Sequence, residues 1–178
     1  MRFVFRERFM YINYYDSPVG RLLLAARGDE LVGLWREGQR YFAAGLIGER
    51  REGETPALRR AARWLDGYFA GEEPGRNGLT LFPAGTPFQR RVWALLEQIP
   101  YGRVTTYGGL AKALGLPPGG ARAVGGAVGR NPISILIPCH RVVGAGGALT
   151  GYAGGLDMKE WLLVHEGAQR SDMWDLGQ

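Results

Sequence analysis

The chain changes character at Pro83-Ala84-Gly85. Apolar and β-branched runs of strand length precede this segment, and short apolar segments with helical spacing, separated by glycine and proline, follow it. A proline- and glycine-containing break between two such patterns is typical of a linker between domains. We therefore expect a first domain at residues 1–83, a second at residues 84–170, and a tail at residues 171–178.

The first domain is expected to begin with an antiparallel meander. Residues 41–47 are weakly periodic and favour a short helix. Thr55-Pro56 supplies an N-cap and an N1 proline for a longer helix that ends near Gly71. Residues 79–82 add one further strand. The strands of the meander are separated by turn sequences and are expected at Phe9–Tyr15, Arg21–Ala26 and Glu30–Trp35.

The second domain is expected to consist of short helices. Thr86 and Gln89 form a capping box that opens a helix reaching about Gln98. Two more short helices follow, joined by a glycine-containing turn, and this pairing resembles a helix-turn-helix. These two helices are expected at residues 107–114, capped by Thr106, and at residues 121–128. Asp157 and Glu160 predict a second capping box and a last helix that ends at Gly167.

Gly125 and Gly126 lie inside the helix expected at residues 121–128. Each glycine costs that helix about 1 kcal/mol relative to alanine, so a close approach of another backbone is expected to offset the cost. Packing against the protein's own chain is one explanation, and it is slightly favoured. The other is a nucleic-acid duplex, into which Arg122, the one large side chain of this small-residue helix, would project.

Basic charge is concentrated in the second domain. Residues 84–170 carry nine basic and four acidic side chains, whereas residues 1–83 carry 13 basic and 11 acidic ones. This distribution suits a polyanionic partner such as nucleic acid. A general preference for arginine is the alternative, because arginine outnumbers lysine twenty to two.

Cys139 is the only cysteine of the chain, and it follows Pro138 at the end of the apolar run at residues 133–137. The run predicts a strand, which the proline ends. His140 and Arg141 place positive charge beside the thiol, which lowers a thiol's pKa and favours a reactive cysteine. The alternative is that Cys139 is a small, inert core residue.

Several classes of protein are disfavoured by the residues present. One cysteine cannot form an internal disulfide, and with two histidines the chain lacks the ligands of an ordinary structural zinc site. No GxGxxG follows a strand and no P-loop lysine is present, so we expect no nucleotide cofactor. No apolar run has the length of a membrane span, and residues 1–6 lack the apolar core of a signal peptide. A reducing cytoplasm fits best.

Four motifs follow one another in the second domain. They are Arg122-Ala123-Val124-Gly125-Gly126, Asn131-Pro132, Pro138-Cys139-His140-Arg141-Val142 and Lys159 to Gly167. With these motifs in this order and spacing, the chain resembles the O6-alkylguanine-DNA alkyltransferases from about Pro87 to Gly167. The resemblance implies an α/β fold in which a small ribonuclease-H-like α/β domain precedes a winged helix-turn-helix domain.

The resemblance implies a role for each catalytic residue. Cys139 would accept the alkyl group. His140 would take the thiol proton through a bridging water, because neighbours in an extended strand point to opposite faces. Glu166 would orient His140. Tyr107 would crowd the 3′ phosphate, rotate the nucleotide out of the stack and then lie against the guanine.

The resemblance also implies the contacts with DNA. Arg122 would fill the space that the nucleotide leaves, with Gly125 and Gly126 allowing the helix to approach the duplex. Asn131 would be the hinge between this helix and Cys139. The remaining residues would surround the base: the carbonyls of Cys139 and Val142, the side chains of Tyr152 and Lys159, and the Ala153 amide.

The implied function is direct DNA repair. The protein, expected to be a monomer in solution, would bind double-stranded DNA through the minor groove. It would move the alkyl group of O6-alkylguanine or O4-alkylthymine irreversibly to Cys139. Two alternatives stay open. One is a non-catalytic DNA-binding regulator with an inert Cys139. The other is a cysteine hydrolase that uses Cys139, His140 and Glu166.

Overall fold

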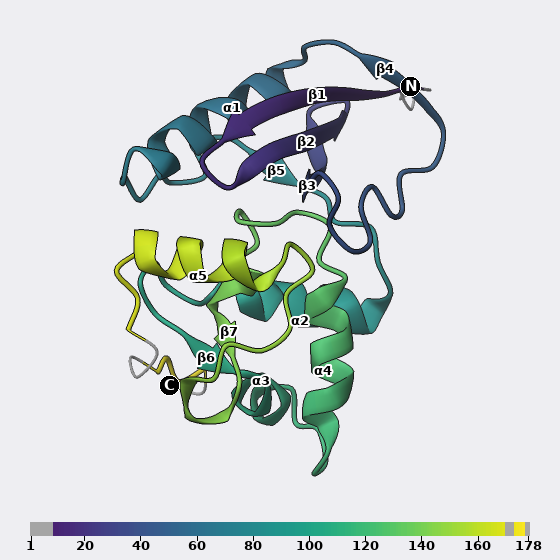
Figure 1. Cartoon of the computed structure of the whole chain (residues 1–178). Helices are drawn as coiled ribbons and strands as arrows, with labels where there is room; N and C mark the ends of the chain where they lie inside the picture. The colour runs from purple at the N-terminus through teal and green to yellow at the C-terminus, as the bar shows by residue number, and fades with distance from the viewer. Residues whose placement is uncertain (1–8, 170–172, 177–178) are drawn as a thin grey trace.

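The computed structural model describes residues 9–169 and 173–176. The expectation for residues 1–6 lies outside the described residues. Two layers of structure are stacked in Figure 1, with the sheet and helix of the first domain above the helices of the second. Within the described residues, no helix is long and apolar enough to cross a membrane.

The first domain is a five-stranded sheet with one covering helix. The strands lie in the order β4-β1-β2-β3-β5. Strand β2 is antiparallel to both β1 and β3, and the short edge strands β4 and β5 are parallel to their neighbours. The expected meander is confirmed. The strands are β1 (Phe9–Ser17), β2 (Gly20–Arg27), β3 (Glu30–Arg36), β4 (Glu49–Glu52) and β5 (Thr80–Leu81).

Helix α1 (Pro56–Phe69) begins where the sequence predicts. The Thr55 side chain accepts a hydrogen bond from the Leu58 amide, and Pro56 occupies the first turn. The helix buries Leu58, Leu65 and Tyr68 against the sheet. The helix expected at residues 41–47 is wrong: this segment is a series of turns in which Tyr41 and Ala43 have positive φ.

The second domain contains four helices and a two-stranded parallel sheet in the described residues. The predicted capping box of α2 forms, with Thr86 and Gln89 bonded reciprocally, and Thr106 caps α3. The elements are α2 (Pro87–Leu96), β6 (Thr105–Thr106), α3 (Tyr107–Ala113), α4 (Gly120–Gly129), β7 (Val142–Val143) and α5 (Leu156–His165), with 3₁₀ turns at Cys139–Arg141 and Ala145–Gly147.

The capping box expected at Asp157 and Glu160 is wrong. Helix α5 begins at Leu156 after Gly155, and no side chain caps it. The Asp157 carboxylate instead accepts two hydrogen bonds from Arg36 of the first domain. A contact between the two domains has therefore replaced the local one.

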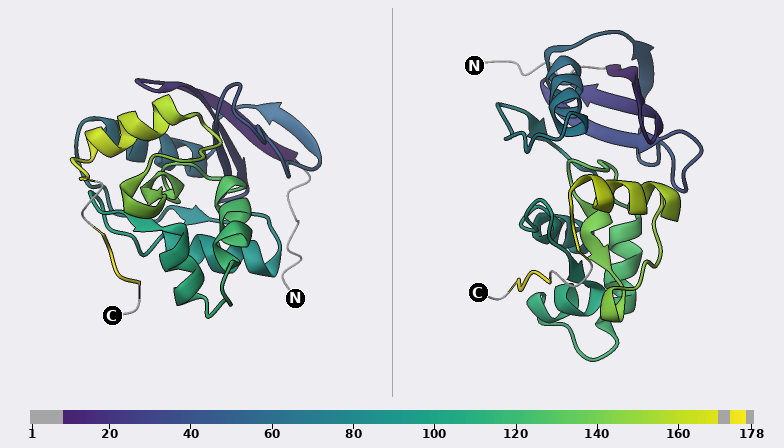
Figure 2. Two further views of the ribbon diagram at one scale, coloured as in Figure 1. Left: turned by 60° about the horizontal axis from the view of Figure 1, so that its bottom comes forward. Right: turned by 60° about the vertical axis from the view of Figure 1, so that its left-hand side comes forward.

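The largest apolar cluster of the described residues runs through both domains. Buried side chains of the sheet and α1 share one cluster with those of α2, α4 and α5. Helix α5 lies directly beneath the first domain in Figure 1 and in the right-hand view of Figure 2. The described end of the chain also returns to the second domain, where the Trp174 amide donates to the Val104 carbonyl. The division at residue 84 stays a prediction, because packing is continuous across it.

Candidate active site

Cys139 lies on a 3₁₀ turn and not at the end of a strand. Ile133 makes one isolated bridge with Leu34, and residues 134–136 form a turn in which Ile135 has φ 69°. The strand expected at residues 133–137 is therefore wrong. Because Cys139 and His140 belong to one 3₁₀ turn, the idea that a strand points them to opposite faces is also wrong. A β-branched residue with positive φ is rare and strained, so the turn before Cys139 is held by its surroundings.

Asn131 holds that turn in place. Its side-chain Nδ2 donates to the carbonyls of Ile137, at 2.8 Å, and Ile133, at 3.4 Å, while its Oδ1 accepts from the Ile133 amide at 3.0 Å. The side chain is 4 % exposed. Asn131 thus joins the end of α4 directly to the segment that carries Cys139, which is where a hinge between them would have to lie.

The Cys139 thiol is almost completely buried, with 4 % of the residue exposed. Burial raises its pKa, and the neighbouring Asn131 amide, Tyr152 hydroxyl and Lys159 ammonium oppose that effect. Neither Asn131 nor Tyr152 reaches hydrogen-bond geometry with the sulfur. The predicted lowering of the thiol pKa by His140 and Arg141 is wrong, because burial dominates and the nearby positive charge comes from Lys159.

Lys159 is a fully buried lysine beside the thiol. Its Nζ donates to the carbonyls of Thr150, at 2.9 Å, and Gly151, at 3.3 Å. Burial lowers the pKa of the ammonium to about 8, against the attraction of a Cys139 thiolate. The Tyr107 hydroxyl donates to the same two carbonyls, at 3.3 and 3.2 Å. Lys159 and Tyr107 therefore hold the segment that leads to Tyr152.

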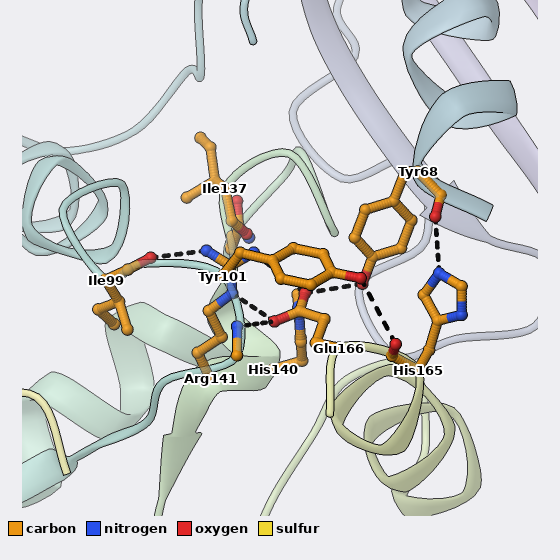
Figure 3. Close-up of polar contacts among 10 residues, drawn as sticks. Tyr68, Ile99, Tyr101, Ile137, His140, Arg141, His165 and Glu166 are labelled. Atoms are coloured by element: carbon orange, nitrogen blue, oxygen red, sulfur yellow. Dashed lines mark hydrogen bonds and ion pairs between the residues drawn. The ribbon is translucent and has the colours of Figure 1, made fainter. Parts of the chain in front are cut away.

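Glu166 is the centre of the polar network in Figure 3. Its Oε1 accepts from His140 Nε2 at 2.6 Å, Tyr68 Oη at 2.8 Å and Arg141 Nη2 at 3.0 Å. Its Oε2 accepts from Arg141 Nε at 2.8 Å and the Gly102 amide at 3.2 Å. Burial opposes the carboxylate charge, but His140 and Arg141 outweigh burial and hold the pKa of Glu166 well below its usual range.

His140 is a neutral base in this arrangement. Burial lowers its pKa, in opposition to the attraction of Glu166. An ionised carboxylate only accepts hydrogen bonds, so the proton of the neutral ring lies on Nε2, which faces Glu166. Nδ1 is buried, and no described residue forms a hydrogen bond with it. The ring therefore keeps one lone pair able to take a proton.

A cavity of about 1130 Å³ opens between α4, Tyr107 of α3 and residues 150–153. Six of the predicted site residues line it: Tyr107, Arg122, Gly125, Gly126, Tyr152 and Ala153. The remaining six, Cys139, His140, Asn131, Val142, Lys159 and Glu166, are buried and are not lining residues. Tyr152 connects the two groups, because it lines the cavity and its hydroxyl affects the Cys139 pKa. The sulfur thus lies behind the cavity wall.

Gly125 and Gly126 of α4 line this cavity. A Cβ built at Gly125 would meet the Tyr107 ring at 3.7 Å, and one built at Gly126 would meet Arg130 Nη1 at 3.6 Å. Both distances are ordinary van der Waals contacts, and no backbone lies within 4 Å of either. The expected close approach of another backbone is therefore wrong within the described chain, although side chains of the protein itself do pack against these two glycines.

The first domain contributes contacts that sequence reasoning missed. Tyr68 reaches Glu166, Arg36 donates to the Gly154 carbonyl at 2.8 Å, and the Arg40 amide donates to the Ala153 carbonyl at 3.0 Å. Tyr68 and Glu166 are 98 positions apart, so no local signal links them. Among the described residues, no group of histidine, cysteine and carboxylate side chains could hold a metal ion.

Comparisons with known proteins agree with this geometry. Residues 87–168 match the family model for the 6-O-methylguanine DNA methyltransferase DNA-binding domain, and residues 10–80 match its ribonuclease-like domain. Two relatives are named methylated-DNA--protein-cysteine methyltransferase. The one from Methanosarcina acetivorans is 46 % identical, over 89 % of this chain and 99 % of the relative. The one from Haemophilus influenzae is 42 % identical, over 88 % of this chain and 86 % of the relative.

Solved structures give the same result. The Mycobacterium tuberculosis O6-methylguanine methyltransferase has a TM-score of 0.76 at 43 % identity, covering 89 % of this chain and 93 % of that one. The M. tuberculosis OGT in complex with DNA also has a TM-score of 0.76, at 42 % identity, over 89 % of this chain and 92 % of that one. The predicted two-domain α/β fold is confirmed.

Proposed function

The chain belongs to the 6-O-methylguanine DNA methyltransferase family, and on that premise we propose which of its atoms carry out the reaction. Members move a methyl group from DNA to a cysteine of the protein, and this chain does the same in DNA repair. Cys139 is its only cysteine, so Cys139 Sγ is the acceptor. The position of this single sulfur behind a cavity, next to Tyr152, is the observation that carries the proposal.

The substrate is O6-alkylguanine, and also O4-alkylthymine, in duplex DNA bound through its minor groove. The alkyl carbon is inside the base stack, so the nucleotide must leave the stack at a cost of a few kcal/mol. Minor-groove proteins offset such a cost with inserted side chains. Arg122 is exposed on α4 at the edge of the cavity, where it can fill the space left in the stack. Tyr107, across the cavity, meets the rotated nucleotide.

Transfer is a displacement at the alkyl carbon. The bond from Cys139 Sγ to that carbon forms as the bond from the carbon to the guanine oxygen breaks, and the electron pair leaves with the base. The thiol proton moves through a bridging water to His140 Nδ1, whose lone pair is available. Tyr107 or the Ala153 amide donates to the base as charge develops on it.

The environment keeps the thiol protonated until substrate is bound. Burial raises the Cys139 pKa, so the resting sulfur is a weak nucleophile and resists oxidation. A base in the cavity brings the electrophilic carbon to the sulfur, and the Lys159 charge then stabilises the thiolate that forms. Because a thioether does not leave readily, each molecule reacts once. The protein acts as a monomer in the cytoplasm.

Duplexes with one defined lesion test this assignment. Methyl transfer is expected from O6-methylguanine and O4-methylthymine, which carry the methyl group on an exocyclic oxygen, and not from N7-methylguanine, which carries it on a ring nitrogen. Cys139→Ala should keep duplex affinity and lose all transfer. A protein that binds these duplexes without accepting any methyl group would instead be a DNA-binding regulator, and one that releases methanol with turnover would be a hydrolase.

A further inference from the structure

The first domain also lines the cavity that receives the nucleotide. Arg40 and Tyr41 belong to the segment between β3 and β4, and they line the cavity together with Arg130 at the end of α4. The Arg40 guanidinium carbon lies 4.9 Å from the centroid of the Tyr41 ring, and that of Arg130 lies 4.8 Å from the same centroid. One aromatic ring therefore holds two cations from two different domains.

Contacts with the rest of the protein hold both the segment that carries Arg40 and Tyr41 and the side chain of Arg130. The Arg40 amide donates to the Ala153 carbonyl, and Ala43 and Leu46 of the same segment pack against buried residues of the sheet. Arg130 Nη1 donates to the Gly126 carbonyl at 3.1 Å. Tyr41 has φ 59°, a strained left-handed conformation for a non-glycine residue that persists where the surroundings hold it. The backbone that carries the ring is thus held at the cavity edge.

The two guanidinium groups have no anionic partner within the described residues. Neither Arg40 nor Arg130 takes part in any of the ion pairs there, whereas Arg36, Arg59 and Arg141 each meet a carboxylate. Both side chains are exposed. Two guanidinium charges on one ring, with no carboxylate beside them, favour the binding of an anion from outside the chain. The planar guanidinium group matches the geometry of a phosphate.

We propose that Arg40, Tyr41 and Arg130 form a clamp for a phosphate of the DNA backbone, so that the first domain binds DNA directly. The proposal rests on the proposed function, because the anion is supplied by the duplex bound along α4. A helix with its side chains is about 10–12 Å wide, and the minor groove is about 6 Å wide. Side chains that flank α4 therefore lie over the phosphates at the groove edge.

The test measures affinity for an undamaged duplex at several salt concentrations, which needs no methyl transfer. Arg40→Gln and Arg130→Gln are each expected to lower the slope of log affinity against log salt by about 0.9, and affinity by about five- to tenfold near 0.1 M salt. The loss should be the same for damaged and undamaged duplexes. Arg40→Lys keeps the charge and should restore the slope.

Arg63→Gln is the matched control, since Arg63 is exposed on α1 and does not line this cavity. It removes the same charge and should leave the slope and affinity unchanged. The clamp is refuted if Arg40→Gln behaves as Arg63→Gln does, or if affinity falls with no change in slope. Absence of methyl transfer by the unmodified protein would refute the proposed function. The comparison of DNA affinities between the Arg40 and Arg63 variants would still test the clamp.

Discussion

Tyr68 of the first domain donates a hydrogen bond to Oε1 of Glu166 in the second, at 2.8 Å and with both residues buried. The same oxygen accepts from His140, the neutral base beside Cys139. Burial, followed by the charge of Glu166, raises the pKa of the Tyr68 phenol, so this group stays a donor at every working pH. Through Glu166, the first domain is therefore linked to the residue that we propose as the proton acceptor of the reaction.

Replacing Tyr68 with Phe should change both stability and pH dependence. Loss of a hydrogen bond to a charged group is expected to lower the free energy of unfolding by about 1.5–3 kcal/mol. Oε1 then interacts more strongly with His140, so the pKa of His140 rises and the acid limb of the rate–pH profile moves to higher pH. Denaturant unfolding and single-turnover rates at a series of pH values measure the two effects. An unmoved acid limb would mean that Tyr68 is merely structural.

Arg141 neutralises Glu166 with two hydrogen bonds, and Arg141→Met should leave that buried carboxylate uncompensated. We expect the free energy of unfolding to fall by about 3–5 kcal/mol. Arg91→Met removes an exposed arginine of α2 and is the control, with an expected change within about 0.5 kcal/mol. Equal stability of the two variants in denaturant would contradict the role given to Arg141.

Acid should destabilise the protein through Glu166. Its pKa in the folded protein is far below the value of about 4.3 for an unfolded chain, so the unfolded state takes up a proton first as the pH falls. The stabilisation is complete above that pH and is lost progressively below it. Unfolding experiments between neutral pH and pH 3 should show this loss, and Glu166→Gln should show a smaller dependence. Parallel curves for the two proteins would be evidence against it.

Gly126→Ala should separate stability from DNA binding. A Cβ has room at this position, and alanine is about 1 kcal/mol better than glycine inside a helix, so the melting temperature should rise. The methyl group would stand on the cavity face of α4, and the ratio of the transfer rate on duplex to that on free O6-methylguanine should fall. A more stable variant with an unchanged ratio would show that α4 does not approach the duplex at this glycine.

Local sequence signals predicted much of the fold. The caps at Thr55, Thr86 and Thr106 each satisfy an amide three residues away, so the necessary residues lie within one turn of chain. The three meander strands are likewise set by short turns. The motifs around the single cysteine also indicated six of the residues that line the cavity, but not Arg40, Tyr41 or Arg130.

Long-range contacts account for what the sequence did not reveal. Asp157 has the sequence of a cap, but Arg36 binds its carboxylate from another domain. The run at residues 133–137 has strand composition, but Asn131 and the pairing with Leu34 fold it into a turn. The pairing of Tyr68 with Glu166 depends on how α1 and α5 pack, which no local pattern specifies.

The central claim is that Cys139 takes one alkyl group and keeps it. The most direct measurement is to incubate the protein with a large excess of O6-methylguanine duplex and to count methyl groups on the peptide that contains Cys139 by mass spectrometry. We predict one methyl group per molecule, at Cys139, with no further consumption of substrate. Continued loss of lesions beyond one equivalent, or a methyl group on any other residue, would contradict the claim.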